Sequence, residues 1–145
     1  MSKVEDFLTA KQEQALIETI RISEKNTSGE IRVHIEKSTE KSPMDRALEV
    51  FYLLEMDKTE LRNGILIYVA VESKKIAIIG DEGINSLVPK DFWDKELALL
   101  ITFFKDSNFT KGLQLVIIEI GKKLKEFFPY QKNDSNELSD EISKG

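Results

Sequence analysis

The sequence of 145 residues contains no cysteine and a single histidine, His34. Without cysteine, the chain can form neither disulfides nor thiolate zinc sites, and it has no cysteine nucleophile. One histidine excludes metal sites built from several imidazoles and the paired histidines of a histidine phosphatase. We expect His34 itself to be a packed or half-exposed strand residue, and Trp93 to be a packing residue near the start of a helix.

Long apolar runs are also missing. The longest, from Gly64 to Val71, has the length of a strand and falls well short of the roughly 18 residues of a membrane span. The N-terminus, MSKVEDFLTAKQEQ, is polar and has no apolar core of the kind that a secretory signal requires. We therefore expect a cytoplasmic protein without direct membrane insertion.

The net charge is −5, and acidic and basic residues are interspersed along the chain. This argues against a general polyanion binder, so nucleic acid is not an expected partner. The hydrophobic residues, 41% of the total, are enough for one core. We expect a single domain over residues 1–129, followed at 130–145 by a polar, acidic and flexible tail. Alternatively, Leu138 and Ile142 dock as one helical turn on the domain or on a partner.

The apolar pattern predicts helices alternating with strands. In chain order, helices are expected at residues 9–24, 42–54, 88–104 and 107–128, and strands at 30–38, 65–71 and 75–80. The capping-box spacing of Thr9 and Gln12 marks the first helix start, and Ser42-Pro43 marks the second. Nearly continuous apolar strands need cover on both faces. The expected fold is therefore α/β, a three-layer α/β/α sandwich with a small mixed sheet covered by helices on both faces.

The expected topology brings three separate loops to one edge of this sheet. A helical crossover makes the first two strands parallel, and the short connection ESKK makes the third strand antiparallel to the second. Glu30, the corner Arg62–Gly64 and the loop Gly80–Gly83 should then meet where two strands begin and the third ends.

Carboxylates, an amide and turn carbonyls together are hard oxygen donors, which suit calcium or magnesium. The predicted metal ligands are Glu30, Asn63, Asp81 and Glu82. The predicted contacts to a phosphate group or to a partner are Arg62, Gly64, Gly80 and Gly83. The alternative is a plain turn, in which the two loop glycines supply positive φ, Asp81 caps local amides, and Glu30 with Arg62 forms a surface ion pair.

Three stretches of the sequence, in this order and spacing, resemble the TPM domain family. They are TSGEIRVHIE at residues 27–36, LRNGILIYVA at 61–70 and IAIIGDEGIN at 76–85. The family takes its name from a plant thylakoid lumen protein, its cyanobacterial relative and a nematode receptor accessory protein. The resemblance covers roughly Phe7 to Pro129, and it implies the same α/β/α sandwich.

The resemblance also implies a function for the loop edge. It implies binding of divalent cations, commonly Ca²⁺, and it implies phosphatase activity, because plant members are described as acid phosphatases. The motif positions carry over to Glu30, Arg62, Asn63, Gly64, Gly80, Asp81 and Gly83. Other members look like assembly or accessory factors, which implies an unidentified protein or peptide partner, such as a component of a membrane complex.

Three functions are compatible with this edge. The leading one is a calcium- or magnesium-binding module whose metal-loaded loops recognise a protein or peptide partner. The alternative is a metal-dependent acid phosphatase that hydrolyses phosphomonoesters at the same site, with Asp81 or Glu82 as metal ligand or base. In the third, the ion only orders the loops. The sequence assigns no catalytic residue.

Overall fold

The computed structural model describes residues 7–129 and 142–145. The elements, in chain order, are α2 Ala10–Glu24, β1 Glu30–Glu36, α3 Pro43–Leu53, the 3₁₀ helix η1 Met56–Lys58, β2 Gly64–Ala70, β3 Lys75–Gly80, α4 Glu82–Asn85, α5 Phe92–Lys105, α6 Phe109–Phe127 and β4 Ser143–Lys144. Within these residues, no helix is both long enough and apolar enough to cross a membrane.

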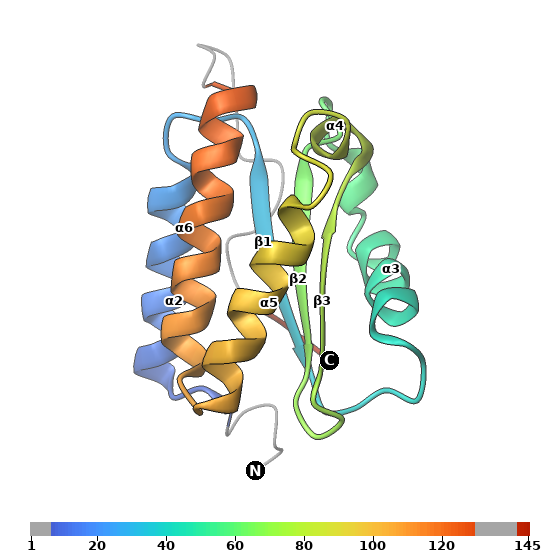
Figure 1. The fold of residues 1–145 in the computed structure, drawn as a ribbon, viewed down its shortest axis with the longest axis vertical. Helices are drawn as coiled ribbons and strands as arrows, with labels where there is room; N and C mark the ends of the chain where they lie inside the picture. Colours follow the sequence, from blue (N-terminus) through green and yellow to red (C-terminus); the bar gives the residue numbers. More distant parts are fainter. Residues whose placement is uncertain (1–6, 130–141) are drawn as a thin grey trace.

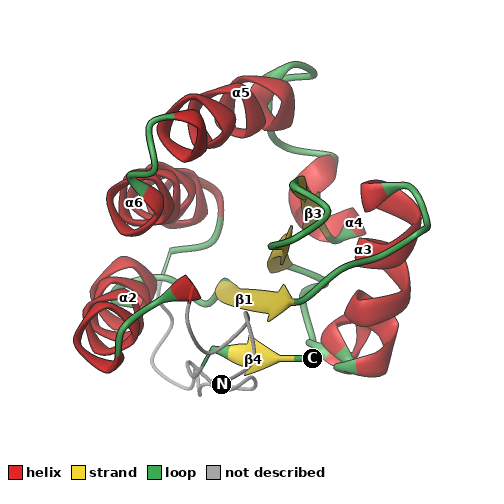
Figure 2. Cartoon of the chain, turned by 90° about the horizontal axis from the view of Figure 1, so that it is seen from below, coloured by secondary structure: helices red, strands yellow, loops and turns green. Residues whose placement is uncertain are grey.

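The sheet has four strands in the order β3-β2-β1-β4. β1 and β2 are parallel, with Glu30 opposite Gly64, and β2 and β3 form an antiparallel hairpin, with Ile65 opposite Gly80. Both pairings confirm the expected topology. In Figures 1 and 2, α3 covers one face of the sheet, while α2, α5 and α6 cover the other. The α/β sandwich is thus as expected.

The central strand β2 is buried on both faces, because its side chains alternate between two cores. Ile65, Ile67 and Val69 pack among the residues of α2, α5 and α6. Leu66, Tyr68 and Ala70 pack against the buried residues of α3. A strand with this double burial needs an unbroken apolar sequence, and residues 64–70 supply it.

Local capping interactions start the first two long helices where the sequence indicates. The Thr9 side chain accepts a hydrogen bond from the Gln12 backbone at 3.1 Å, and the Gln12 side chain accepts one from the Thr9 backbone at 2.9 Å. Ser42 Oγ accepts a hydrogen bond from the Asp45 backbone at 3.2 Å. These caps satisfy amides that the first helical turn leaves without partners.

Two helix boundaries differ from expectation. The helix predicted from Val88 begins at Phe92, because Pro89 disfavours helical backbone in the preceding residue, and the separate short helix α4 precedes it. The last helix begins at Phe109 rather than Ser107, whose φ of 59° is left-handed.

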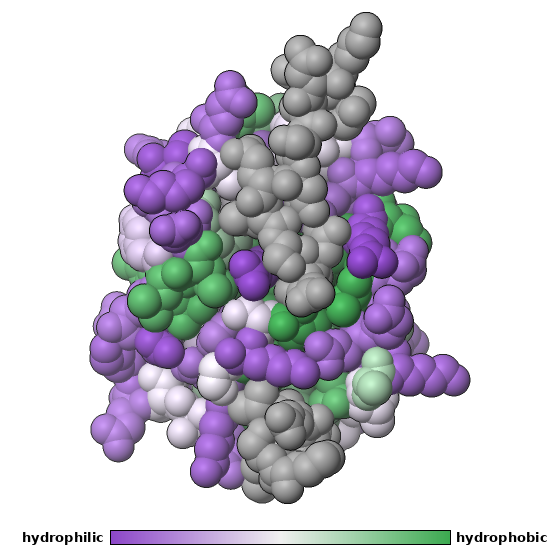
Figure 3. Space-filling model, turned by 180° about the vertical axis from the view of Figure 1, so that it is seen from behind, coloured by the Kyte–Doolittle hydropathy of each residue, from purple (hydrophilic) through white to green (hydrophobic). Residues whose placement is uncertain are grey.

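The outer side of α3 exposes apolar side chains. Leu48 is 44% exposed, whereas Val50, at 1%, faces the sheet. Met44 and Tyr52 are exposed one turn to either side of Leu48. The view from behind in Figure 3 shows mostly hydrophilic side chains around smaller apolar patches.

The last four residues pack on the domain. Ile142 is buried with 7% exposure in the core, Ser143 and Lys144 pair in parallel with His34 and Ile35, and the Gly145 backbone donates to the Ile35 carbonyl at 3.0 Å. These residues differ from the expected flexible tail. Ile142 does dock on the domain, but it leads into a strand and not a helical turn. Leu138 and the rest of 130–141 lie outside the described residues.

Candidate functional site

Three chain segments meet at the edge of the sheet beside α4, at the upper end of the molecule in Figure 1. The Glu30 backbone donates to the Asn63 carbonyl at 3.4 Å, the Asp81 backbone to the Gly64 carbonyl at 2.9 Å, and the Gly83 backbone to the Arg62 carbonyl at 2.8 Å. We call this the loop edge: Glu30, Arg62–Gly64 and Gly80–Gly83. The structure therefore brings together every segment that the sequence predicts to meet there.

Asp81 occupies the centre of the loop edge and is 6% exposed. Its carboxylate accepts two hydrogen bonds from Arg62, from Nε at 2.9 Å and from Nη2 at 3.2 Å. It also accepts the Glu82 backbone N–H at 2.7 Å and so caps α4. The pKa of Arg62 is raised by its hydrogen bond to Asp81 and by that carboxylate's charge. The buried carboxylate is thus neutralised by a guanidinium whose side chain is 43% exposed.

Glu30 and Asn63 are more deeply buried, at 2% and 1% exposure. The Asn63 side-chain nitrogen donates to Ser28 Oγ at 3.4 Å, and its backbone N–H donates to Thr59 Oγ1 at 3.3 Å. These two bonds hold Asn63 in place. Both use its nitrogen atoms as donors, and its side-chain oxygen can act only as an acceptor or ligand. Glu82 differs, since its side chain is 82% exposed and lies 3.8 Å from Arg62 Nη2. A ligand set here therefore combines three buried residues with one at the surface.

The loop glycines are required by close packing and not by backbone conformation. A Cβ on Gly83 would lie 2.1 Å from the Leu61 carbonyl oxygen, and one on Gly80 would lie 2.4 Å from Cζ2 of Trp93. No glycine among the described residues has positive φ, so that part of the plain-turn alternative is wrong. The left-handed residue at the edge is Arg62, with φ of 53°.

Trp93 and Asn85 lie against the loop edge, although the sequence alone did not place them there. Trp93 lies against Gly80, and its Nε1 donates to Asn85 Oδ1 at 2.7 Å. The available sequence signal for Asn85 is its spacing from Asp81: it ends the short helix α4 that Asp81 caps. This pair covers the end of β3 and stabilises the neighbouring loop.

The donor set of the loop edge fits a hard cation in its chemistry, because it combines two carboxylates and an amide oxygen that come from separate segments. Within residues 7–129 and 142–145, no three or more His, Cys, Asp or Glu side chains form a group suited to a metal ion. Asp81 is also engaged by Arg62. The described residues therefore form no ready-made cation site at this edge, and one would require Arg62 to leave the Asp81 carboxylate.

A second polar cluster lies on the α3 side of the sheet, and sequence reasoning missed it. Glu36, buried at 5% exposure, accepts hydrogen bonds from Arg46 Nε at 2.9 Å and Nη2 at 3.0 Å, and from the Tyr68 hydroxyl. Burial opposes ionisation of Glu36, but the bonds from Arg46, Tyr68 and His34 outweigh it and lower the pKa to about 2.

His34 joins this cluster to the C-terminal strand. Its Nε2 lies 3.1 Å from Glu36 Oε1 and its Nδ1 lies 3.0 Å from Ser143 Oγ. Burial lowers the pKa of His34, against the opposing effect of Glu36. His34 and Glu36 are two residues apart and so share one face of β1, which was the available sequence signal for this cluster. Because Glu36 is fully engaged, we interpret the cluster as a structural network that fixes β4 and α3 to the sheet.

The matches to known proteins cover most or all of the chain. A family model described as the TPM domain matches residues 1–123. Among solved structures, the chain is similar to the BA42 protein from the psychrophilic bacterium Bizionia argentinensis, with 52% identity, a TM-score of 0.90 and coverage of 100% of both chains. Among curated proteins, none matches the chain.

A more distant solved structure shares the fold alone. It is the N-terminal domain of a protein from P. gingivalis, with 15% identity and a TM-score of 0.71, over 86% of this chain and 83% of that chain. The α/β sandwich therefore persists at low sequence identity.

Proposed function

Since the chain belongs to the TPM domain family, we propose that it is a divalent-cation-binding module that acts as a protein-interaction or accessory domain. Glu30, Asn63, Asp81 and Glu82 hold the ion, which is Ca²⁺ or, as the alternative cation, Mg²⁺. The surface around the ion, which contacts a partner or a phosphate group, is formed by Arg62, Gly64, Gly80 and Gly83.

One observation carries this proposal: two buried carboxylates from distant segments lie at the same edge. Glu30 is opposite Gly64 in the register of β1 and β2, and the Gly64 carbonyl accepts the Asp81 backbone N–H. Both carboxylates are buried, at 2% and 6% exposure. Burying negative charge is costly unless a cation or hydrogen bonds compensate for it. Arg62 supplies that compensation to Asp81 in this structure, and in our proposal a bound divalent cation takes its place.

Without the ion, Arg62 supplies the positive charge that pairs with Asp81. Its guanidinium holds Asp81, but its side chain is 43% exposed, so it can rotate toward solvent without disturbing the core. When a cation binds, the released guanidinium can pair with a carboxylate or phosphate of a partner. Cation binding is thereby coupled to the exposure of a recognition group.

Exposed apolar side chains at the same end of the sheet support the interaction role. Leu61, beside Arg62, is 42% exposed, Leu87 after α4 is 46% exposed, and Leu53 at the end of α3 is 71% exposed. An exposed apolar patch with a polar rim marks a protein-interaction site, and in our proposal these leucines supply its apolar part. The proposed partner is therefore a protein or peptide with apolar side chains and an acidic group for Arg62.

An amide NMR titration with Ca²⁺ and Mg²⁺ tests the ion site. The proposal predicts saturable shifts at Glu30, Asn63 and Asp81, and their loss in the Asp81→Asn variant. Asp91→Asn is the matched control, because Asp91 is an exposed aspartate that pairs with Lys95 and is not one of the proposed ligands. No localised response up to about 10 mM Ca²⁺, beyond the weak end of protein calcium sites, would refute the proposal.

Phosphomonoester hydrolysis at the same edge is the alternative function, and the accessible guanidinium of Arg62 favours it because it can grip phosphate oxygens. The test is hydrolysis of p-nitrophenyl phosphate by the calcium- and magnesium-loaded protein. Turnover that disappears in both Asp81→Asn and Arg62→Met, but not in Asp91→Asn, would establish it. Ion binding without turnover supports the binding module.

A further inference from the structure

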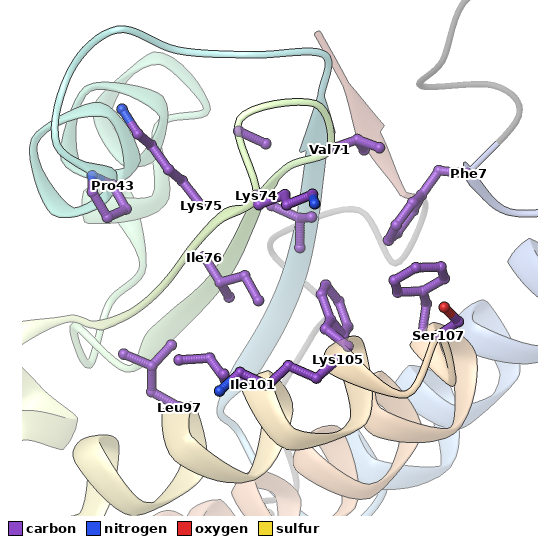
Figure 4. Close-up of a pocket in the computed structure, with 14 residues that line it drawn as sticks. Phe7, Pro43, Val71, Lys74, Lys75, Ile76, Leu97, Ile101, Lys105 and Ser107 are labelled. Atoms are coloured by element: carbon purple, nitrogen blue, oxygen red, sulfur yellow. The ribbon is translucent and has the colours of Figure 1, made fainter.

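A second candidate site lies at the opposite end of β2 and β3 from the loop edge. A cavity of about 800 Å³ opens between the β2–β3 hairpin, α5 and the segment around Phe7 (Figure 4). Its size falls in the range of small-molecule sites, which is roughly 300–1,000 Å³. The cavity shares no residue with the loop edge, so the inference that follows stands independently of the proposed function.

The floor of the cavity is apolar. Val69 and Ile76 come from the sheet, and Leu97, Ile101 and Phe104 come from α5. Ile101 is 37% exposed, which is unusual for an isoleucine that faces a sheet. The surface offered here is elongated, because it follows successive turns of one helix along a hairpin.

An aromatic cluster closes one end of the cavity. The ring of Phe7 lies 5.9 Å from that of Phe104 and 4.5 Å from that of Phe109, and the rings of Phe104 and Phe109 are 5.0 Å apart. Figure 4 shows the Phe7 ring turned toward the cavity from the side opposite Leu97. A ligand entering from the hairpin side therefore meets an apolar wall.

The charged groups that line the cavity are all positive. Lys74, Lys75 and Lys105 are among its 14 lining residues, none of which is acidic, in a chain of net charge −5. Lys75 Nζ is fixed at the rim by the carbonyls of Thr39 at 3.1 Å and Lys41 at 2.9 Å. In Figure 4, Lys105 runs along α5 toward Ile101, and Lys74 projects from the hairpin beside Val71.

Lys74 and Lys105 form no ion pair or hydrogen bond with any of the described residues through their ammonium groups. Other lysines of the chain are paired with carboxylates, as Lys41 is with Glu49 and Lys95 with Asp91. A cationic rim above an apolar floor is complementary to a molecule with an anionic head and an apolar chain.

We propose that this cavity binds an amphipathic carboxylate, a single alkyl chain that ends in a carboxylate group. The chain lies along Val69, Ile76 and Ile101 toward the aromatic cluster, and the carboxylate meets Lys74 and Lys105 at the rim. The stabilisation comes from the apolar area removed from water, and the lysines select the sign of the head group.

The first test is an amide NMR titration of the full chain with dodecanoate, below its micelle-forming concentration. The proposal predicts saturable shifts confined to residues 69–76 and 97–109. Ile101→Trp should weaken them by placing a bulky ring across the apolar floor, and this residue is exposed enough to accept the larger side chain. Ile118→Trp is the matched control, because Ile118 is 41% exposed on α6 and does not line the cavity.

The second test concerns the charge. Lys74→Asn and Lys105→Gln should each weaken dodecanoate binding about two- to fivefold, the usual effect of one exposed ion pair. Asn suits position 74, where φ is 54°. Lys125→Gln, an exposed lysine on α6 that does not line the cavity, should leave the affinity unchanged. Dodecyl maltoside, which has a neutral head, should bind the wild type and the three lysine variants weakly and equally.

Three results would overturn the inference. The first is the absence of saturable shifts with dodecanoate. The second is equal affinity for dodecanoate and dodecyl maltoside, which would make the cavity a general apolar surface. The third is a set of shifts at residues 69–76 that depends on protein concentration without any ligand, which would assign the cavity to contact with a second copy of the chain.

Discussion

Arg62 forms a two-point ion pair with Asp81, with Nε 2.9 Å from Oδ2 and Nη2 3.2 Å from Oδ1. The carboxylate is buried at 6% exposure, whereas the Arg62 side chain is 43% exposed. In our proposal, the guanidinium and a divalent cation compete for the same oxygens. Arg62 therefore sets the affinity of the loop edge for the ion, although it is not a ligand.

Replacing Gly83 by alanine should destabilise the loop edge. The new Cβ would lie 2.1 Å from the Leu61 carbonyl oxygen and 2.6 Å from that of Arg62, and backbone atoms cannot move aside cheaply. We expect the free energy of unfolding to fall by about 1–3 kcal/mol in urea denaturation. Glu82→Ala, one residue earlier and exposed, should change it by less than about 0.5 kcal/mol. Equal effects of the two variants would contradict the packing role of Gly83.

Truncating Ile142 to alanine should show that the C-terminal residues are part of the core. Ile142 is 7% exposed and packs in the main hydrophobic cluster. We expect a loss of roughly 2 kcal/mol in the free energy of unfolding, the lower end of the range for isoleucine truncations. The comparison is Ile118→Ala, at a residue with 41% exposure. A loss no larger than that of the Ile118 variant would mean that β4 does not contribute to stability.

Glu96 should make stability depend on pH near neutrality. Burial, and then the charge of Glu119, raise the pKa of Glu96 from 4.5 to about 7. A raised pKa means that the protonated form is favoured on folding, so the stabilisation is full below about pH 4.5 and is lost as pH rises through about 7. Glu96→Gln should therefore flatten the decline of the free energy of unfolding between those values.

The measurement for Glu96 is urea denaturation at a series of pH values on the wild type, Glu96→Gln and Glu126→Gln. Glu126 is a suitable control because it is an exposed glutamate on α6 that pairs with Lys123 at 3.3 Å. Its variant should keep the wild-type pH profile. If Glu96→Gln also kept the wild-type profile, the prediction of a raised pKa for Glu96 would be wrong.

The sequence predicts the layers and the loop edge because both follow from local rules. Apolar runs of strand length, a crossover helix and a four-residue connection favour the observed arrangement of β1, β2 and β3. That arrangement forces Glu30, Asn63 and Asp81 together, whatever their separation along the chain. The capping pair Thr9 and Gln12 likewise needs no tertiary information.

What the sequence does not reveal depends on contacts between distant segments. β4 has only two residues, too few for an alternating pattern, and it exists because Ile142 enters the core. The network of Glu36, Arg46 and Tyr68 joins three elements, so the alternation along β1 indicates only one part of it. The left-handed conformation of Arg62 is equally hidden, because glycine or asparagine is the usual residue there.

The most direct test of the central claim is calorimetric titration of Ca²⁺ into the wild type, Asp81→Asn and Arg62→Met. If the guanidinium and the cation compete for Asp81, the two halves of one ion pair must respond in opposite directions. Asp81→Asn should abolish binding, and Arg62→Met should tighten it about two- to fivefold, because a competing exposed charge is removed. Unchanged or weaker binding in Arg62→Met, or full binding in Asp81→Asn, would contradict the claim.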